Sequence, residues 1–282
     1  MNSQMNQPAP VAGGVRLLDG LVYAETLGFR PLRLDLYLPP VDAGPVPLVV
    51  FVHGGGWVRG DRKVFTPTLL EWVPGPFERL AAEGFAVASV DYRLSGEARF
   101  PAQLEDLSAA MEWLAEHAER FGYDADRTVL WGESAGAHLA MLLVLRDGCR
   151  VRGLVDWYGP TDLRSPVVVA GAVASLSSDP EDTREARLLG APASAVPARA
   201  REASPITHVR PGAPPFLVAH GTADKAVPFE QSAALVAALT DAGVDVRFDT
   251  VEGADHLWVG LEDLEPVFAS AVDFVREMTG PR

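Results

Sequence analysis

The chain has 282 residues but a single cysteine, Cys149, so it cannot form a disulfide within itself. In the segment RDGCRVRG no histidine or aspartate lies immediately beside this cysteine, so no adjacent base would activate its thiol. No stretch approaches the roughly 18 consecutive apolar residues that a membrane span requires. The opening residues MNSQMNQPAPVAGG lack the basic start and apolar centre of a signal peptide, and their composition predicts a flexible tail over residues 1–14. We therefore expect a cytoplasmic location.

Basic residues are scarce, because 24 lysines and arginines stand against 38 aspartates and glutamates, for a formal net charge of −14. Such a surface would repel nucleic-acid phosphates, so the composition argues against a nucleic-acid partner. Hydrophobic residues make up 48% of the chain and charged residues 22%, proportions that are typical of a globular protein. The length suits one α/β domain over residues 1–282.

Apolar runs alternate with helical patterns along the chain. Nearly continuous apolar runs, typical of strands covered on both faces, occupy residues 47–53, 85–92, 127–132, 151–159, 215–221 and 244–253. Residues 32–38 alternate between leucine and other residues, which predicts a half-buried strand near a sheet edge. Apolar residues recur at helical spacing over residues 104–114, 229–243 and 265–278. A further helix is predicted over residues 135–146. This alternation predicts an α/β fold, with a mostly parallel sheet of about eight strands and helices on both faces.

Residues 163–205 interrupt the alternation. The segment is too long for a simple connection and contains the stretch SSDPEDTREARLLGAPASAVPARAREASP. Because it follows the apolar run 151–159, we predict a small cap inserted after that strand.

A serine lies where a predicted strand meets a predicted helix. The pentapeptide Gly132-Glu133-Ser134-Ala135-Gly136 fits G-x-S-x-G, a strained turn that presents a serine oxygen as a nucleophile. Close packing of small residues between a helix and a sheet is the alternative interpretation. If the turn is present, the N–H of Ala135 points from the helix N-terminus toward the same space as the serine.

Three glycines follow the apolar run 47–52, in the segment HGGGW. Three consecutive glycines without side chains allow backbone N–H groups to face an incoming oxygen, as an oxyanion hole requires. A flexible turn and a phosphate loop are the alternatives, but a phosphate loop would continue with lysine and serine or threonine, where this chain has Trp57. Trp57 and Trp258 flank the candidate loops, as core residues or as part of a substrate pocket.

A serine hydroxyl needs a base within hydrogen-bond reach, and His256 is the best placed of six histidines. It follows the last predicted strand, among small residues in VEGADHLWVG. Asp224, just beyond the run 215–221, can reach this loop, whereas Asp255 is tied to the backbone beside His256. The chain order Ser134, Asp224, His256 matches the order that follows a nucleophile elbow. Structural or solvated roles are expected for the other histidines, His53, His117, His138, His208 and His220.

Longer segments resemble the α/β-hydrolase superfamily, and within it the bacterial esterases related to hormone-sensitive lipase and to the feruloyl-esterase-like group. The segments are HGGGWVRGD, VDYRLSGEARFPAQLEDL, GESAGAHLA, ASPITHVRPGAPPFLVAHGTADKAVPFEQS and GADH, and together they span about residues 30–260. The resemblance implies an α/β-hydrolase fold and catalytic roles for Ser134, Asp224 and His256. It also implies oxyanion donors at Gly55, Gly56 and Ala135. Since the first clear strand is predicted to start near residue 15, we expect the N-terminal cap of larger relatives to be short here.

The sequence therefore predicts a serine carboxylesterase that hydrolyses small to medium esters through an acyl-enzyme on Ser134, with no metal or organic cofactor. The same groups could instead hydrolyse an amide, formamide or peptide bond. A binding protein that has kept the fold but lost turnover is the non-enzymatic alternative. The expected partner is a small-molecule ester, and a homodimer is left open.

Overall fold

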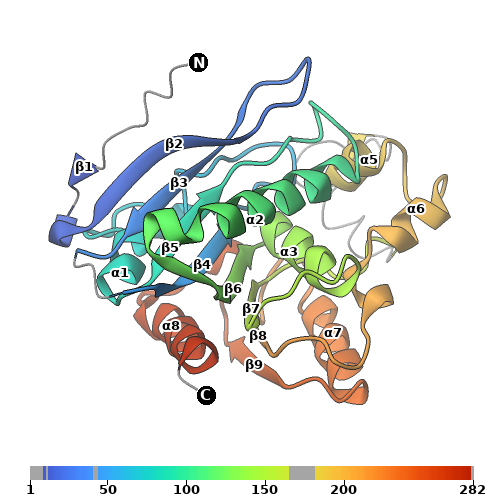
Figure 1. The fold of residues 1–282 in the computed structure, drawn as a ribbon. Coiled ribbons are helices and arrows are strands. Elements are labelled where there is room, and N and C mark those ends of the chain that lie inside the picture. Colours follow the sequence, from blue (N-terminus) through green and yellow to red (C-terminus); the bar gives the residue numbers. More distant parts are fainter. Residues whose placement is uncertain (1–8, 11, 41–43, 165–181, 281–282) are drawn as a thin grey trace.

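The computed structural model describes residues 9–10, 12–40, 44–164 and 182–280 (Figure 1). Nine strands of this part of the chain form one sheet in the order β1-β2-β3-β5-β4-β6-β7-β8-β9. Their bounds are β1 Ala9–Pro10, β2 Arg16–Ala24, β3 Leu32–Leu38, β4 Val46–Val52, β5 Ala86–Val90, β6 Tyr123–Glu133, β7 Gly153–Trp157, β8 Phe216–Gly221 and β9 Val246–Val251. The strands from β5 to β9 in this order run parallel, whereas β1, β2 and β3 pair antiparallel.

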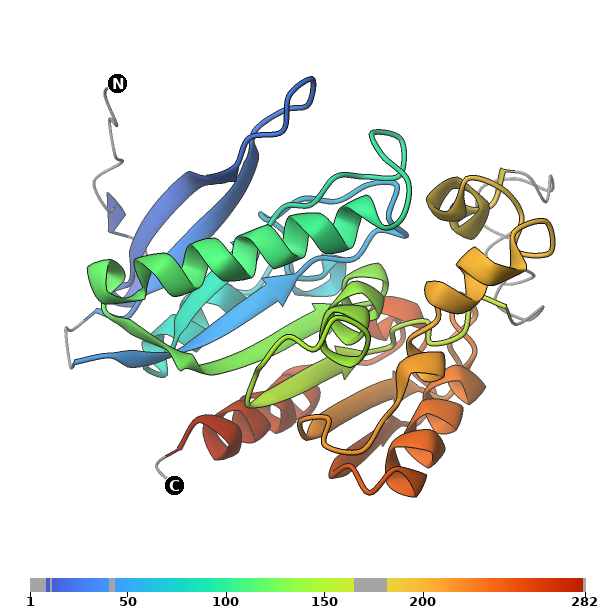
Figure 2. The same ribbon diagram turned by 45° about the vertical axis from the view of Figure 1, so that its right-hand side comes forward.

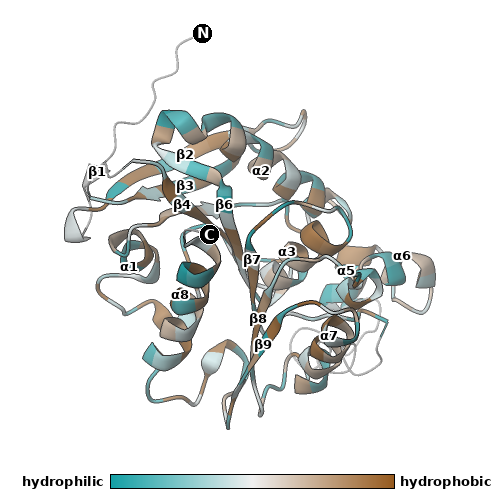
Figure 3. Ribbon diagram, turned by 60° about the horizontal axis from the view of Figure 1, so that its bottom comes forward, coloured by the Kyte–Doolittle hydropathy of each residue, from teal (hydrophilic) through white to brown (hydrophobic). Residues whose placement is uncertain are grey.

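Helices cover both faces of the sheet. The α-helices are α1 Pro76–Ala82, α2 Ala102–Phe121, α3 Ala135–Leu145, α5 Arg184–Leu189, α6 Pro197–Glu202, α7 Phe229–Asp241 and α8 Glu265–Thr279, and short 3-10 helices span Ala12–Gly14, Pro67–Leu69, Pro205–His208 and His256–Trp258. Figure 3 shows α1 and α8 on one face, with α2, α3 and α7 on the other. Each face has its own cluster of buried apolar side chains. The predicted α/β fold with a mostly parallel sheet is therefore confirmed.

The helix α3 is buried along its whole length, from Ala135 to Leu145. Its sequence AGAHLAMLLVL is apolar almost all round, as expected of a helix that lies within the core and not at the surface. It packs against β6, β7 and β4. A fully buried helix is held in one position, so its first residues have little freedom to move.

The strand β3 departs from the predicted half-buried strand near a sheet edge in its burial, although it is only the third of nine strands in the sheet order. It lies between β2 and β5 and pairs antiparallel with both of them. Asp35 is fully buried and Tyr37 is 5% exposed, so the face predicted to be polar is also covered. Tyr37 stacks on Phe77 of α1.

The predicted flexible tail is also corrected in part. Ala9 and Pro10 pair with Leu17 and Arg16 of β2, so these two residues belong to the sheet. Residues 1–8 and 11 of the predicted tail lie outside the described residues.

The predicted cap, 163–205, follows β7 and precedes β8, and its residues 165–181 lie outside the described part. The described remainder carries α5 and α6, which Figure 2 shows beyond the carboxyl end of β4. Leu188 and Leu189 of α5 and Ala200 of α6 join the main apolar core. The N–H of Phe100 donates to the carbonyl of Leu188 at 2.9 Å, which ties α5 to the segment before α2.

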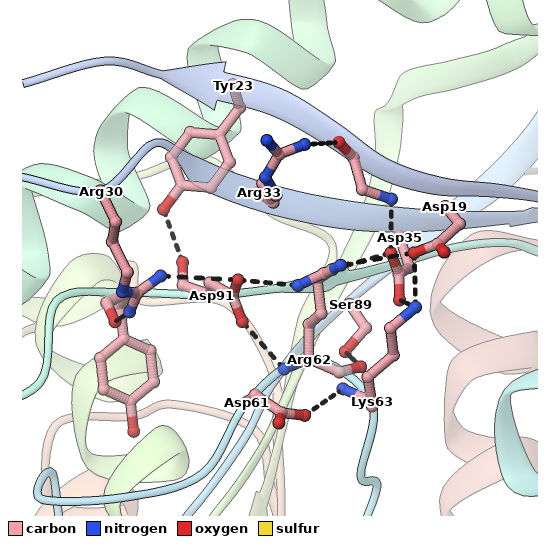
Figure 4. A network of polar contacts seen from close by, with 12 residues as sticks. Asp19, Tyr23, Arg30, Arg33, Asp35, Asp61, Arg62, Lys63, Ser89 and Asp91 are labelled. Atoms are coloured by element: carbon pink, nitrogen blue, oxygen red, sulfur yellow. Dashed lines mark hydrogen bonds and ion pairs between the residues drawn. The ribbon is translucent and has the colours of Figure 1, made fainter. Parts of the chain in front are cut away.

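A network of charged side chains joins β2, β3, β5 and the segment after the glycine loop (Figure 4). Arg62 Nε donates to buried Asp35 Oδ1 at 2.7 Å, and its Nη1 donates to Asp91 Oδ2 at 3.0 Å. The backbone N–H of Arg62 donates to the other oxygen of Asp91, also at 3.0 Å. Lys63 Nζ lies 2.8 Å from Asp35 Oδ2. These contacts hold the chain at Arg62, a few residues beyond the glycines.

We expect Asp35→Ala to lower the free energy of unfolding by about 3 kcal/mol, because removing one member of a buried ion pair leaves the other charges uncompensated. Asp19→Ala is the matched control: the Asp19 side chain, also in contact with Arg62, is 57% exposed, and we expect a loss below about 1 kcal/mol. Urea unfolding of the two variants measures both values. Equal losses would contradict a special role for the buried aspartate.

Candidate active site

Ser134 occupies a sharp turn between β6 and α3, with φ 51° and ψ −119°. Gly132 and Gly136, the glycines on either side of this turn, have no room for a side chain because other backbone atoms lie close to their Cα atoms. A Cβ on Gly132 would lie 2.5 Å from the backbone N and Cα of Ala137, and one on Gly136 would collide with the carbonyl oxygen of Val52. The packing interpretation of these glycines and the strained-turn interpretation therefore both hold, because close packing is what makes the turn possible.

The structure brings Ser134, His256 and Asp224 together from the ends of three parallel strands. Ser134 Oγ lies 3.0 Å from His256 Nε2, and His256 Nδ1 lies 2.7 Å from Asp224 Oδ2. The serine follows β6, the aspartate follows β8 and the histidine follows β9. With Nδ1 protonated and donating to the carboxylate, the ring presents Nε2 as an acceptor to the hydroxyl.

Asp224 is held by donors on both of its oxygens, and its side chain is only 1% exposed. Its Oδ1 accepts from the N–H groups of Ala226 and Val227, each at 2.8 Å. Burial alone would raise the pKa of this carboxyl, but hydrogen bonds from His220 and His256 outweigh burial and hold the pKa well below its usual range. Asp224 is therefore a carboxylate at any pH near neutrality.

His220 contacts Asp224, which the sequence did not predict, because this histidine was expected only to end a strand. Its Nε2 lies 3.2 Å from Asp224 Oδ2 and 2.9 Å from the carbonyl oxygen of Val227. Its Nδ1 lies 2.6 Å from the hydroxyl of Ser232. The ring is fully buried, and it supplies a second histidine contact to the aspartate that faces His256. Its position four residues before Asp224, at the end of a predicted strand, could have pointed to this contact.

Asp255 does not touch the ring of His256. Its Oδ1 accepts from the backbone N–H of His256 at 2.8 Å and from that of Lys225 at 2.9 Å, and its Oδ2 lies 2.8 Å from Lys225 Nζ. Asp255 thus joins the loop after β9 to the loop after β8. This geometry agrees with the choice of Asp224 over Asp255.

The glycine loop is fixed at Gly54 by a side chain of the serine turn. The N–H of Gly54 donates to Glu133 Oε1 at 3.0 Å, and the carbonyl of His53 accepts from the hydroxyl of Tyr92 at 3.0 Å. Among the residues described, no hydrogen-bond acceptor is recorded for the N–H groups of Gly55, Gly56 or Ala135. Donors without an internal partner remain available to a ligand atom.

Glu133 and Tyr158 are two further residues that sequence reasoning did not single out. Tyr158 donates its hydroxyl to Glu133 Oε2 at 2.8 Å, and its ring packs edge-on against His256 with centroids 4.8 Å apart. Burial raises the pKa of the Glu133 carboxyl, against the lowering effect of its hydrogen bonds. The position of Glu133 inside the serine pentapeptide could have pointed to it. Nothing in the sequence marks Tyr158, whose contact with His256 arises only in the fold.

Trp57 and Trp258, the predicted pocket residues, are 2% and 1% exposed. Trp57 Nε1 donates to His138 Nδ1 at 3.2 Å, and Trp258 packs edge-on against Tyr158 and Trp157. Of the two roles considered for these rings, core packing is the one that their burial fits. Contact with a substrate stays a prediction for both.

The remaining histidines make internal contacts. His53 stacks on Tyr92, and His138 is fully buried with its Nε2 2.7 Å from the carbonyl oxygen of Ala203. His117, expected to be solvated, is half-buried and stacks on Trp113. The described ranges contain no cluster of three metal-binding side chains, and no helix within them has the length and apolar character needed to cross a bilayer.

The parallel sheet, the strained serine turn and the Ser–His–Asp chain at the carboxyl ends of the strands define an α/β-hydrolase. Within that class the chain belongs to the BD-FAE family, whose model matches residues 34–239. The resemblance expected from the motifs is therefore confirmed.

Named relatives and solved structures agree with this assignment. Esterase LipC of Mycobacterium tuberculosis is 32% identical over 75% of this chain and 53% of its own length, and carboxylesterase NlhH of the same organism is 32% identical over 61% of this chain and 53% of its own. A truncated carbohydrate esterase from gut microbiota superposes with a TM-score of 0.77 at 25% identity, over 94% of this chain and 96% of that one. A propionate-bound esterase of Thermogutta terrifontis gives 0.72 at 26% identity, over 96% and 97%. The chain spans about half the length of the curated relatives that it matches.

Asp156 is a fully buried carboxyl on β7, close to the site. Its Oδ1 accepts from the N–H of Gly159 at 2.8 Å. Burial raises its pKa to about 7, against the lowering effects of that hydrogen bond and of His220. In the folded protein this group therefore holds its proton to a higher pH than in the unfolded chain.

We expect the stability of the wild type, relative to Asp156→Asn, to fall as pH rises from about 4 to about 7. In this window the folded state binds more protons than the unfolded state, so the free energy of unfolding decreases with pH. Above it both states are ionised and the difference becomes constant. Urea midpoints of the two proteins at several pH values test this expectation, and parallel curves would contradict it.

Proposed function

We propose that this chain hydrolyses carboxylic esters through an acyl-enzyme on Ser134, with His256 as general base and acid and Asp224 as its carboxylate partner. The observation that carries the proposal is the continuous chain of contacts, 3.0 Å from Ser134 Oγ to His256 Nε2 and 2.7 Å from His256 Nδ1 to Asp224 Oδ2. Both distances are those of hydrogen bonds along which a proton can pass from serine to histidine.

In the first step, the Ser134 oxygen attacks the ester carbonyl while its proton moves to His256 Nε2. The carbonyl oxygen becomes an oxyanion that accepts hydrogen bonds from the N–H groups of Gly55, Gly56 and Ala135. The ionised carboxylate of Asp224 stabilises the imidazolium formed in this step.

The tetrahedral intermediate then collapses, and the C–O bond to the alcohol breaks. The leaving oxygen takes the proton from His256 Nε2, which regenerates the neutral base. Water enters, gives a proton to the same nitrogen and attacks the acyl carbonyl. A second collapse releases the carboxylic acid and returns the proton to the Ser134 oxygen, so the proton count balances over the cycle.

The positions of Glu133 and Tyr158 support this proposal. Glu133 holds Gly54, the residue before the proposed donors, and its side chain comes from the residue before the nucleophile. One buried carboxyl thus joins the two loops whose relative position sets the distance from the nucleophile to the oxyanion site. Tyr158 packs against His256 and is tied to the same carboxyl.

The choice of ester over amide follows the named relatives. The curated relatives LipC and NlhH are named an esterase and a carboxylesterase, and the Thermogutta protein is an esterase with propionate bound. Small to medium carboxylic esters are accordingly the proposed substrates. A cytoplasmic location and a homodimer remain predictions from the sequence.

Ser134→Ala should reduce turnover of a short-chain p-nitrophenyl ester by roughly 10⁴-fold or more, because the methyl group cannot attack the carbonyl. Treatment of the wild type with a fluorophosphonate should place one adduct on Ser134, located by mass spectrometry. Unchanged urea unfolding of the variant is the control for folding. An adduct on another serine, or full activity in the variant, would remove Ser134 from the mechanism.

Asp224→Asn should reduce turnover by about 10⁴-fold, since an amide neither fixes the tautomer of His256 nor stabilises the imidazolium. Asp255→Asn is the matched control, because Asp255 carries the same charge and lies next to His256 but bonds only its backbone. We expect about a tenfold loss or less from this variant, through disturbance of the loop. Both are measured with one ester at one pH. The reverse ranking would mean that the carboxylate partner is wrongly assigned.

A further inference from the structure

Two arginines lie against the glycines proposed to supply the oxyanion donors. A Cβ on Gly56 would collide with Cδ of Arg184 and lie 3.0 Å from its Nε. A Cβ on Gly55 would lie 3.2 Å from Cγ of Arg59. Arg59 belongs to the glycine loop itself, whereas Arg184 comes from α5, in the segment between β7 and β8. Two cationic side chains from distant parts of the sequence thus border consecutive residues of one loop.

Neither arginine forms an ion pair in the part of the chain that the structure describes. No ion pair or side-chain hydrogen bond joins Arg59 or Arg184 to another described residue, and Arg184 Nε is buried without a hydrogen-bond partner. Burial first, and then the charge of Arg59, lower the pKa of the Arg184 guanidinium. Two like charges held together beside a buried donor are unfavourable unless an anion joins them.

Glu185 is the acidic neighbour of Arg184 in the chain, but it is a weak counter-charge. Its side chain is 5% exposed, and burial raises the pKa of its carboxyl to about 7, so it is partly protonated at neutral pH. Its Oε2 is itself buried without a partner and does not pair with the guanidinium. The guanidinium groups of Arg59 and Arg184 can therefore still donate hydrogen bonds to an anion.

A cavity of about 540 Å³ opens between α5 and the segment 95–99. Arg99 and Arg187 line it, together with Ser95, whose N–H donates to the carbonyl oxygen of Trp57 at 2.8 Å. Arg187 is paired with Asp182 at 2.6 Å, whereas Arg99 has no ion pair within the described ranges. In a chain of net charge −14, four arginines thus lie on or beside α5 and the glycine loop, and only Arg187 of the four forms an ion pair within the described residues.

We infer that Arg184, with Arg59 beside it, binds a carboxylate carried by the ester substrate, so that the enzyme prefers acidic esters to neutral ones of the same shape. The inference rests on the proposed ester hydrolysis and adds the substrate class. A guanidinium matches a carboxylate with two parallel N–H···O bonds, and the unpartnered Nε of Arg184 is one of the donors that such a pair uses.

The test compares esters that differ only by a carboxylate or a carboxamide. Monomethyl glutarate and its primary amide place the group on the acyl side of the ester. The pair para-acetoxybenzoate and para-acetoxybenzamide places it on the alcohol side. The ratio of kcat/KM for the acid to kcat/KM for the amide is measured for each pair in the wild type and in variants.

In the wild type we expect this ratio to exceed one for one of the two pairs, which identifies the side that carries the charge. Arg184→Gln should lower that ratio by roughly tenfold, the usual size of a charge-assisted hydrogen-bond loss. Arg184→Lys should retain part of it, since lysine keeps the charge but not the planar fork. Arg276→Gln is the matched control: it removes the same charge from α8, where Arg276 pairs with Glu83, and should leave the ratio unchanged.

A ratio of one or below in both pairs, or a ratio that Arg184→Gln leaves unchanged, would overturn the inference while leaving ester hydrolysis intact. Failure of the proposed function has a different signature, namely no Ser134-dependent hydrolysis of either the acids or the neutral amides. That result would also remove the premise of the inference.

Discussion

Ser134 has φ 51° and ψ −119°, a conformation that costs a residue with a side chain roughly 1–3 kcal/mol. Its N–H donates to the carbonyl of Trp157 on β7, and its own carbonyl accepts from the N–H of His138, one turn into α3. The helix that begins at the next residue is buried throughout. The strain is therefore held between the centre of the sheet and a helix that has no room to shift.

The same strain recurs around the candidate site. The other non-glycine residues with positive φ in the described ranges are Trp57, Tyr158, Leu257 and Trp258. All lie in the loops that follow β4, β7 and β9, at the edge of the sheet where Ser134 lies. Strained loops of this kind persist only where rigid elements support them, and here the parallel strands and the buried aromatic core give that support.

Asp224 and Glu133, two buried acidic residues of the candidate site, have pKa values displaced in opposite directions. Asp224 is held in its ionised form by donors on both oxygens, whereas burial favours the protonated form of Glu133. The imidazole therefore has a fixed negative charge on its Nδ1 side. Hydrogen bonds from two histidines outweigh burial at Asp224, whereas burial outweighs the hydrogen bonds that Glu133 accepts.

Much of this arrangement could be predicted from residue order. Polar residues placed directly after apolar runs pointed to Ser134, Asp224, His256 and the glycine loop, because the ends of parallel strands meet at one edge. The prediction went wrong at β3, where alternation of leucine with Asp35 and Tyr37 indicated a half-buried strand near a sheet edge, whereas both of its faces are covered. Local alternation does not reveal that Phe77 of α1 packs on Tyr37, or that Arg62 and Lys63 supply charges to a buried aspartate.

The sequence by itself determined the alternating α/β plan, the serine turn and the order of its partners, because these depend on periodicity and on residues close together in the chain. Only the tertiary structure decided which side chains from distant segments come into contact. Glu133 reaches Gly54, His220 joins Asp224, Tyr158 packs on His256, and Arg184 lies against Gly56. Each of these contacts depends on how far and in which direction a loop turns after its strand. The packing of the whole fold sets the path of each loop, because the local propensities of the loop residues do not encode that path.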